Sequence, residues 1–357
     1  MRSLFTLVVL ALTAIFVAAS PAVVASGTTE AQTRTVTAPA PLASTCSNAR
    51  KFTYFGVNQS GAEFGNNKIP GVKGTDYIWP APSSIDYFVN QGFNFFRVPF
   101  QLERLTPPSV GITGNFDSAY FADLQQTVNY ITNKGATVAI EPHNFLIYNG
   151  QTMTNTAQFQ TFWKNLASRF ASNNRVIFDL MNEPHDVPAS QVASMMQAGI
   201  NGIRSAGATQ QLILVEGTSW TGAWTWSSSG NAAAFGNLQD PNNNFAIEMH
   251  QYLDSDGSGT SANCVSSTIL AERLADATNW LKQHNLRGFL GEVGAGANPT
   301  CISAVFGGLC AAAQSGAWIG ISWWAAGPWW GTYFQSIEPP SGAAVSSILP
   351  QALKPFL

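Results

Sequence analysis

Eight short apolar runs, rich in β-branched and aromatic residues, recur through the chain and constrain its fold more than any other feature. They end, at intervals of 32 to 44 residues, at Asn58, Pro99, His143, Glu183, Glu216, His250, Glu292 and Trp324. Each interval has room for one helix, which is the pattern of a parallel α/β fold. Eight such units predict a closed (β/α)8 barrel of the TIM type. The alternative is a doubly wound sheet, but no G-x-G-x-x-G follows the first strand.

Helical periodicity fills several of these intervals. Phe121, Leu124, Val128 and Ile131 recur at three- and four-residue spacing, which predicts a helix over residues 118–134. Residues 159–170 and 269–284 have a similar pattern. We also expect an eighth helix over residues 343–353.

The N-terminus has the pattern of a signal peptide. Arg2 precedes an apolar run over residues 4–19, and small residues follow it up to position 25. The run is shorter than the roughly 20 residues that a membrane span needs. Residues 1–25 are therefore predicted to be a signal peptide and residues 26–45 a disordered leader rich in Thr, Ala and Pro. Residues 46–357 are predicted to be a single catalytic domain.

Composition limits the partners of the chain. Charged residues make up 10% of it, and the net charge is −3. No basic stripe is available to bind nucleic acid. We predict a secreted, extracellular protein that has no nucleic-acid or membrane partner and is a monomer.

Polar residues end nearly every predicted strand, and in such a barrel the active site lies at those ends. Glu183 and Glu292 end the fourth and seventh strands, which face each other across the barrel mouth. Two facing carboxylates about 5 Å apart suit cleavage of a glycosidic bond with retention of configuration. Glu216 is the rival carboxylate, and we expect it to be a structural partner instead. Glu141 and Glu248 precede strand-end histidines by two residues, so we expect them to be buried one layer deeper.

The motifs around these residues resemble one known family. Asn182-Glu183-Pro184, Gly291-Glu292, Arg97-Val98-Pro99 and His250-Gln251-Tyr252 are similar to glycoside hydrolase family 5. Four longer motifs are similar to the fungal endo-β-1,4-glucanase branch of this family. They are SGAEFG (residues 60–65), MNEPHD (181–186), LDSDGSGT (253–260) and WAAGPWWG (324–331). The resemblance covers residues 52–357. It implies an endo-β-1,4-glucanase, a cellulase, that acts on β-glucan polysaccharide.

The resemblance also implies a role for each site residue. Glu183 would be the acid/base, kept protonated by the charge of Glu292, and Glu292 the nucleophile, held ionised by Arg97 and the Tyr252 hydroxyl. Asn182 would bind the 2-hydroxyl of the sugar, and Trp324 would form the floor on which the sugar stacks. His143 and His250 would orient the sugar and the acid/base. Weaker candidates are Asn58, at a strand end in the cleft, and Trp79, Trp220 and Trp329 or Trp330 as further stacking rings.

Other chemistries lack their sequence motifs. No residues have metal-ligand spacing, so we expect no metal and no cofactor. G-x-S-x-G, the motif of a serine hydrolase, is absent. A β-mannanase or β-1,3-glucanase on the same barrel stays open, as does a non-catalytic carbohydrate-binding barrel. The WAAGPWWG motif favours glucan.

Barrel geometry predicts the pairing of the four cysteines. Cys264 follows the sixth strand and Cys301 the seventh, so both lie in loops on the catalytic face. Cys46 precedes the first strand, and Cys310 lies late in the helix that returns from the catalytic face to the opposite one. We therefore predict Cys264–Cys301 and Cys46–Cys310 disulfides, in keeping with a secreted chain.

Overall fold

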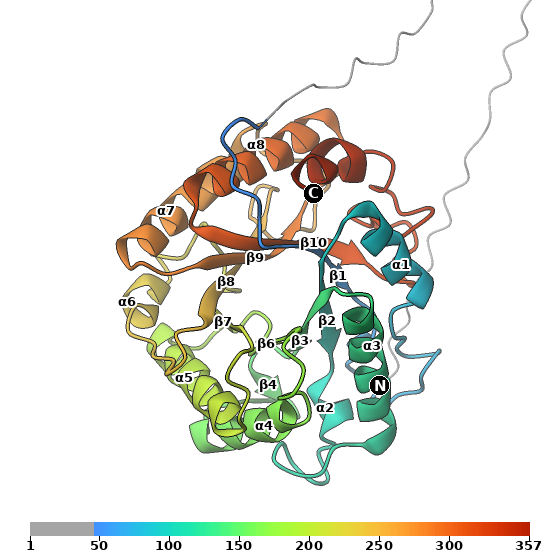
Figure 1. Ribbon diagram of the computed structural model, residues 1–357, viewed down its shortest axis with the longest axis vertical. Coiled ribbons are helices and arrows are strands. Elements are labelled where there is room, and N and C mark those ends of the chain that lie inside the picture. The colour runs from blue at the N-terminus through green and yellow to red at the C-terminus, as the bar shows by residue number, and fades with distance from the viewer. Residues whose placement is uncertain (1–45) are drawn as a thin grey trace, which may run out of the picture. The chain divides into compact units, whose positions relative to one another are not determined.

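The computed structural model describes residues 46–357. The predicted signal peptide and leader, residues 1–45, lie outside the described residues. Eight parallel strands close into a barrel in the order β1-β10-β9-β8-β7-β6-β3-β2, and Figure 1 shows helices arranged around them. The strands are β1 (Tyr54–Gln59), β2 (Phe95–Phe100), β3 (Thr137–Pro142), β6 (Val176–Asp179), β7 (Ile213–Glu216), β8 (Phe245–Tyr252), β9 (Gly288–Gly294) and β10 (Trp318–Ala326). The (β/α)8 barrel and its eight predicted strands are confirmed.

Helices cover the outside of the barrel. They are α1 (Pro82–Gln91), α2 (Leu102–Leu105), α3 (Ser118–Asn133), α4 (Thr156–Ser168), α5 (Ala189–Ser205), α6 (Asn231–Phe235), α7 (Ile269–Gln283) and α8 (Pro299–Ser315). Side chains cap three of them, because Asp117, Asn155 and Asn298 each accept a backbone N–H of the first turn. The periodic segments predicted to be helical correspond to α3, α4 and α7, so these predictions are confirmed.

The predicted eighth helix over residues 343–353 is wrong. Turns occupy most of its first half, and a π-helical turn (Leu349–Leu353) and a 3-10 turn (Lys354–Phe356) follow. Pro350 has no N–H to continue an α-helical hydrogen-bond ladder, and Gly342 favours a turn. The segment still covers the barrel, because Phe356 packs on Phe306 of α8 at 5.4 Å between ring centroids.

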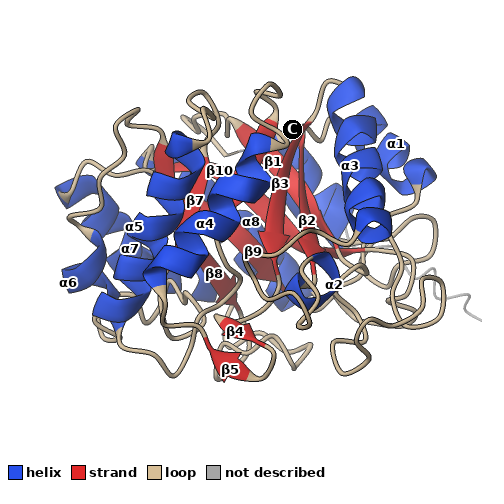
Figure 2. Ribbon diagram, turned by 90° about the horizontal axis from the view of Figure 1, so that it is seen from below, coloured by secondary structure: helices blue, strands red, loops and turns tan. Residues whose placement is uncertain are grey.

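A two-stranded hairpin follows β3 and was not predicted. It pairs β4 (Ile147–Tyr148) with β5 (Gln151–Thr152), and Figure 2 shows it among the loops beyond one end of the barrel. Strands of two residues are too short to give a period-two pattern in the sequence.

The barrel interior is layered, and the layers follow from the alternation of side chains along a strand. Phe95, Ala139, Ile177, Leu214 and Ala246 belong to one buried apolar cluster. Two residues further along the same strands, on the same inward face, stand Arg97, Glu141, Asp179, Glu216 and Glu248, all buried. An apolar layer therefore lies beneath a layer of charged side chains, and the strand ends lie above both.

The two disulfides pair as predicted. Cys46 bonds Cys310 with Cα atoms 5.6 Å apart, and Cys264 bonds Cys301 with Cα atoms 5.4 Å apart. Cys301 lies in the first turn of α8 and not in the preceding loop. Within residues 46–357, no helix is both long and apolar enough to cross a membrane.

Candidate active site

Arg97 stands at the centre of the charged layer and organises it. Its Nε lies 2.7 Å from Asp179 Oδ2 and 3.1 Å from Glu248 Oε1. Its Nη1 lies 2.9 Å from Glu292 Oε1, and its Nη2 lies 3.0 Å from Glu216 Oε1. Burial raises the pKa of Glu248 well above its usual range, and the neighbouring charge of Asp179 adds to the effect. One guanidinium therefore holds several carboxyl groups.

Glu183 lies four residues beyond the end of β6, on backbone with a positive φ of 46°. This conformation is uncommon for a residue with a side chain. The Glu183 backbone N–H donates to Glu216 Oε2 at 2.7 Å, which stabilises the turn. Glu216 is thus a structural partner, as expected, and it holds the main chain of Glu183.

Glu183 and Glu292 converge on His250. His250 Nδ1 lies 2.7 Å from Glu183 Oε1 and 3.5 Å from Glu292 Oε2. One carboxylate oxygen of each glutamate lies within 4.8 Å of the other. Glu292 Oε2 also accepts the hydroxyl of Tyr252. Two carboxylates from facing sides of the barrel therefore share one small volume.

Burial and neighbouring charges give Glu183 and Glu292 different pKa values. Burial raises the pKa of Glu183 well above its usual range, and the like charge of Glu292 raises it further. Burial also raises the pKa of Glu292, but Arg97, His143 and the Tyr252 hydroxyl oppose that rise. Glu292 consequently loses its proton first. The larger cause at Glu183 is burial, and not the like charge that the sequence suggested.

Two histidines flank the pair, each above a buried glutamate. His143 Nδ1 lies 2.8 Å from Glu141 Oε1, and His250 Nε2 lies 3.5 Å from Glu248 Oε1. Burial lowers the pKa of His143 and lowers that of His250 well below its usual value. The expected buried positions of Glu141 and Glu248 are confirmed.

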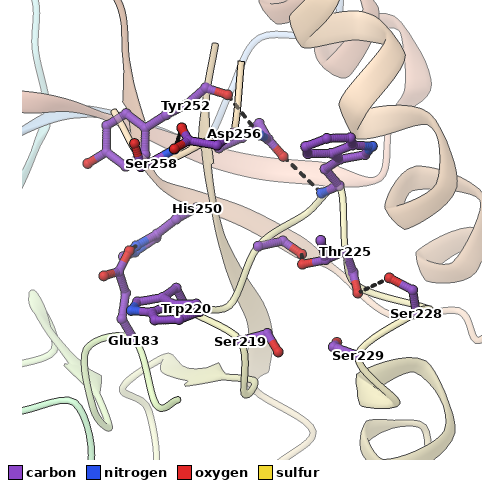
Figure 3. Close-up of a pocket in the computed structure, with 14 residues that line it drawn as sticks. Glu183, Ser219, Trp220, Thr225, Ser228, Ser229, His250, Tyr252, Asp256 and Ser258 are labelled. Atoms are coloured by element: carbon purple, nitrogen blue, oxygen red, sulfur yellow. Dashed lines mark hydrogen bonds and ion pairs between the residues drawn. The ribbon is translucent and has the colours of Figure 1, made fainter. Parts of the chain in front are cut away.

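Two cavities lie at this end of the barrel, one beside Glu183 and one beside His143. One, of about 660 Å³, is lined by Glu183, His250, Tyr252 and the exposed rings of Trp220 and Trp224; Figure 3 shows Trp220 beside Glu183 and His250. The other, of about 520 Å³, is lined by residues that include His143, Phe145, Trp324, Trp329 and Trp330.

A row of rings connects the two cavities. Trp324 is stacked on His143 with centroids 5.6 Å apart, and Phe145 lies 5.4 Å from His143. Phe145 lies 5.9 Å from His185, which is stacked on Trp220 at 4.8 Å. An aromatic path therefore crosses the barrel mouth on one side of the two glutamates.

Comparison with known proteins identifies the family. A family model described as cellulase (glycosyl hydrolase family 5) matches residues 57–328. The chain belongs to glycoside hydrolase family 5. It is 52% identical to endo-beta-1,4-glucanase B of Aspergillus niger over 302 residues, which are 84% of this chain and 89% of that protein.

Solved structures of the family 5 fold are also similar. An endo-beta-1,4-glucanase from Xanthomonas axonopodis pv. citri is 41% identical with a TM-score of 0.80, and the match covers 85% of this chain and 99% of that one. XacCel5A, solved in complex with cellopentaose, is 37% identical with a TM-score of 0.81, and the match covers 86% and 99% of the two chains.

Two of the weaker site candidates in this family 5 chain are wrong. Trp79 is buried in the core, because its ring packs on Tyr120 with centroids 5.0 Å apart. Asn58 is also wholly buried and does not reach the cleft. Its Oδ1 accepts from Arg97, and its Nδ2 donates to Gly291 O at 2.9 Å. Asn58 therefore supports the barrel from within.

The sequence prediction includes neither Asp179 nor the position of His185. Asp179 interrupts the apolar run of β6 on the inward face, and this alternation could have identified it. His185 follows the fourth strand closely, but its place in the sequence indicates no role for it. Only the folded loops bring its ring against Trp220.

Two groups of residues in this family 5 site are close enough together to bind a metal ion. Glu183, His250 and Glu292 form one group, and Glu216, Glu248 and His250 form the other. Arg97 lies within 3.1 Å of Glu216, Glu248 and Glu292, and its positive charge opposes a cation there. The absence of a metal stays a prediction.

Proposed function

We propose that the protein is a secreted endo-β-1,4-glucanase that hydrolyses internal bonds of cellulose and other β-glucans with retention of configuration. The observation that carries this proposal is the approach of Glu183 and Glu292 to within 4.8 Å. Retaining glycosidases hold their carboxyl groups about 5–5.5 Å apart, whereas inverting enzymes leave room for a water molecule.

In the first step the Glu292 carboxylate attacks the anomeric carbon. The glycosidic C–O bond breaks, and the leaving oxygen takes the proton of Glu183. In the second step water gives a proton to Glu183 and attacks the same carbon, which releases Glu292 as a carboxylate. The higher pKa of Glu183 and the Arg97 contact of Glu292 suit these roles.

Asn182 is suited to bind the sugar 2-hydroxyl. Its Oδ1 accepts from Arg97 Nη2 at 2.9 Å, which orients the amide. Its Nδ2 has no hydrogen-bond partner among the described residues. That donor is therefore available for the contact that strengthens toward the transition state.

The lining of the two cavities supports one direction for the bound substrate. Glu183, which protonates the leaving group, lines the Trp220 cavity, so this cavity takes the sugars on the leaving-group side. Trp324 lines the other cavity and would form the floor for the sugar that becomes bonded to Glu292. A chain that continues in both directions is cut internally, as an endo-acting enzyme requires. The similar proteins named endo-β-1,4-glucanases support this substrate class.

The cysteines support an extracellular site of action. Two disulfides are typical of proteins that fold in an oxidising compartment. Together with the predicted signal peptide they support secretion. We further expect a monomer without nucleic-acid or membrane partners.

A substrate panel tests the proposal. Reducing-end release is measured side by side from carboxymethylcellulose, galactomannan and laminarin, with and without EDTA. The proposal predicts by far the highest rate on carboxymethylcellulose and no effect of EDTA. Preferential release from galactomannan or laminarin would overturn the glucan assignment, and no release from any of them would indicate a binding protein.

A further inference from the structure

We propose that His185 is a positioning residue that holds Trp220 as the binding platform for sugars on the leaving-group side. This inference rests on the proposed retaining mechanism and extends it to the acceptor half of the cleft. His185 follows the acid/base by two residues, so the platform and the proton donor are joined by a short piece of chain.

The orientation of the Trp220 ring depends on contacts with other segments, because the backbone around it is in an unfavourable conformation and the side chain is half exposed. Ser219, Trp220 and Thr221 all have positive φ, between 47° and 55°. Consecutive residues with side chains rarely adopt this region, so neighbouring structure must hold them there. The Trp220 side chain is 52% exposed, and such a ring would be free to change rotamer without a partner.

The support comes from the segment after Glu183. The Trp220 backbone N–H donates to Pro184 O at 3.1 Å, and the Thr218 hydroxyl donates to Val187 O at 2.6 Å. His185 then covers one face of the Trp220 indole, with centroids 4.8 Å apart and planes inclined by 16°. Sugars bind indoles through a flat ring face, and the stack leaves the other indole face for one.

His185 is itself fixed. Its Nδ1 lies 2.7 Å from Asp186 Oδ2, and its ring contacts Phe145 at 5.9 Å. The second exposed indole of this cavity has a comparable support, because the guanidinium of the buried Arg273 lies 4.3 Å from the Trp224 ring. Both rings of the cavity therefore have a side chain that sets their orientation.

Acceptor partitioning measures this role directly. With an activated aryl β-cellobioside donor, Glu292 displaces the aryl group, and the covalent cellobiosyl-enzyme forms whether or not sugars occupy the acceptor side. Water or the 4-hydroxyl of added cellotriose then attacks the anomeric carbon. In each case the attacking oxygen gives its proton to Glu183, and the bond to Glu292 breaks. Cellopentaose formed per aryl group released, at initial rate, thus reports how well cellotriose binds and attacks in competition with water.

We expect His185→Ala to lower this ratio by roughly threefold to tenfold, the range for loss of one aromatic stack. Trp220→Ala should lower it at least as much, and the double variant should fall no further than Trp220→Ala. His185→Phe, which keeps a stacking ring, should restore most of the ratio. Aryl release in the absence of acceptor is measured in parallel, so that a general loss of active enzyme cancels from the ratio.

His284→Ala is the matched control. His284 also packs on an indole, that of Trp280 at 4.7 Å, but lines neither cavity. Its removal should leave the ratio unchanged. An unchanged ratio in His185→Ala, or additive losses in the double variant, would overturn the positioning role. Hydrolysis by the wild type without any cellopentaose would overturn the acceptor platform and leave the proposed hydrolase intact, whereas no aryl release would refute the proposed function itself.

Discussion

Glu216 accepts the backbone N–H of Glu183 at 2.7 Å, so a fully buried carboxyl group fixes the main chain of the proposed proton donor. The other oxygen of Glu216 accepts from Arg97 Nη2 at 3.0 Å. Both oxygens are therefore engaged as acceptors, and the residue that rivalled Glu183 for catalysis positions it instead.

Glu216→Gln should impair both stability and turnover. Glutamine has a single acceptor oxygen, so one of the two donors would lose its partner. We expect a loss of about 2 kcal/mol in the free energy of unfolding by urea, with a fall in kcat. Asp240→Asn is a matched control, because Asp240 also accepts a backbone N–H and an arginine, Arg204. It should lose stability but keep kcat, and an equal loss of kcat in both variants would contradict the positioning role.

The pH dependence of kcat/KM should be bell-shaped. Activity needs Glu292 deprotonated and Glu183 protonated, so it rises through the first pKa and falls through the second. Burial raises both values, that of Glu183 further, so both limbs should lie above the usual range of a glutamate, with an optimum on the acidic side of neutrality.

Tyr252→Phe separates the two limbs. The Tyr252 hydroxyl lowers the pKa of Glu292. Its loss should therefore move the acidic limb to higher pH and leave the alkaline limb in place. A shift of the alkaline limb alone would reverse the assignment of the two glutamates.

Removal of the Cys264–Cys301 disulfide should lower stability more than activity. The bond joins cysteines 37 positions apart. The chain-entropy model assigns about 4 kcal/mol to closure of a loop of this size. The variant with serine at both positions should lose an amount of that order in urea unfolding, and should retain most of its kcat at 25 °C. A loss of less than about 1 kcal/mol would argue against the entropic account.

The sequence was informative where the barrel imposes a simple rule. Parallel strands of a closed barrel bring their C-terminal ends to one face, so the positions of Glu183, His250 and Glu292 at or just beyond these ends are enough to group them in one site. The same rule placed the cysteines on two faces and yielded both disulfides.

The sequence was uninformative where the conformation of a loop decides whether a side chain is buried or exposed. Trp79 and Trp220 are both tryptophans in loops, yet one packs on Tyr120 in the core and the other is exposed beside Glu183. Residue type alone does not separate these outcomes. The prediction of a last helix is wrong because Pro350 and the turn before it outweigh an apolar pattern.

Glu183→Gln should discriminate between leaving groups. The variant cannot protonate the departing oxygen, so cello-oligosaccharides, whose sugar leaving groups are poor, should be hydrolysed at least about 100-fold more slowly, in line with the usual contribution of general acid catalysis. Aryl cellobiosides with acidic phenols need no proton, and the step that forms the glycosyl-enzyme should change little. Burst kinetics with such a substrate measures that step, and equal slowing of both substrate classes would exclude Glu183 as the acid.

Glu292→Gly tests the central claim most directly. The substitution removes the nucleophile and leaves a space beside the anomeric carbon, so turnover of an activated aryl β-cellobioside should fall by several orders of magnitude. Added azide can occupy that space and attack from the same side as Glu292 did. The measurement is the rate and the product configuration, followed by NMR, with and without azide. The account predicts restored aryl release and an α-cellobiosyl azide, inverted relative to the substrate. Full activity without azide would contradict it.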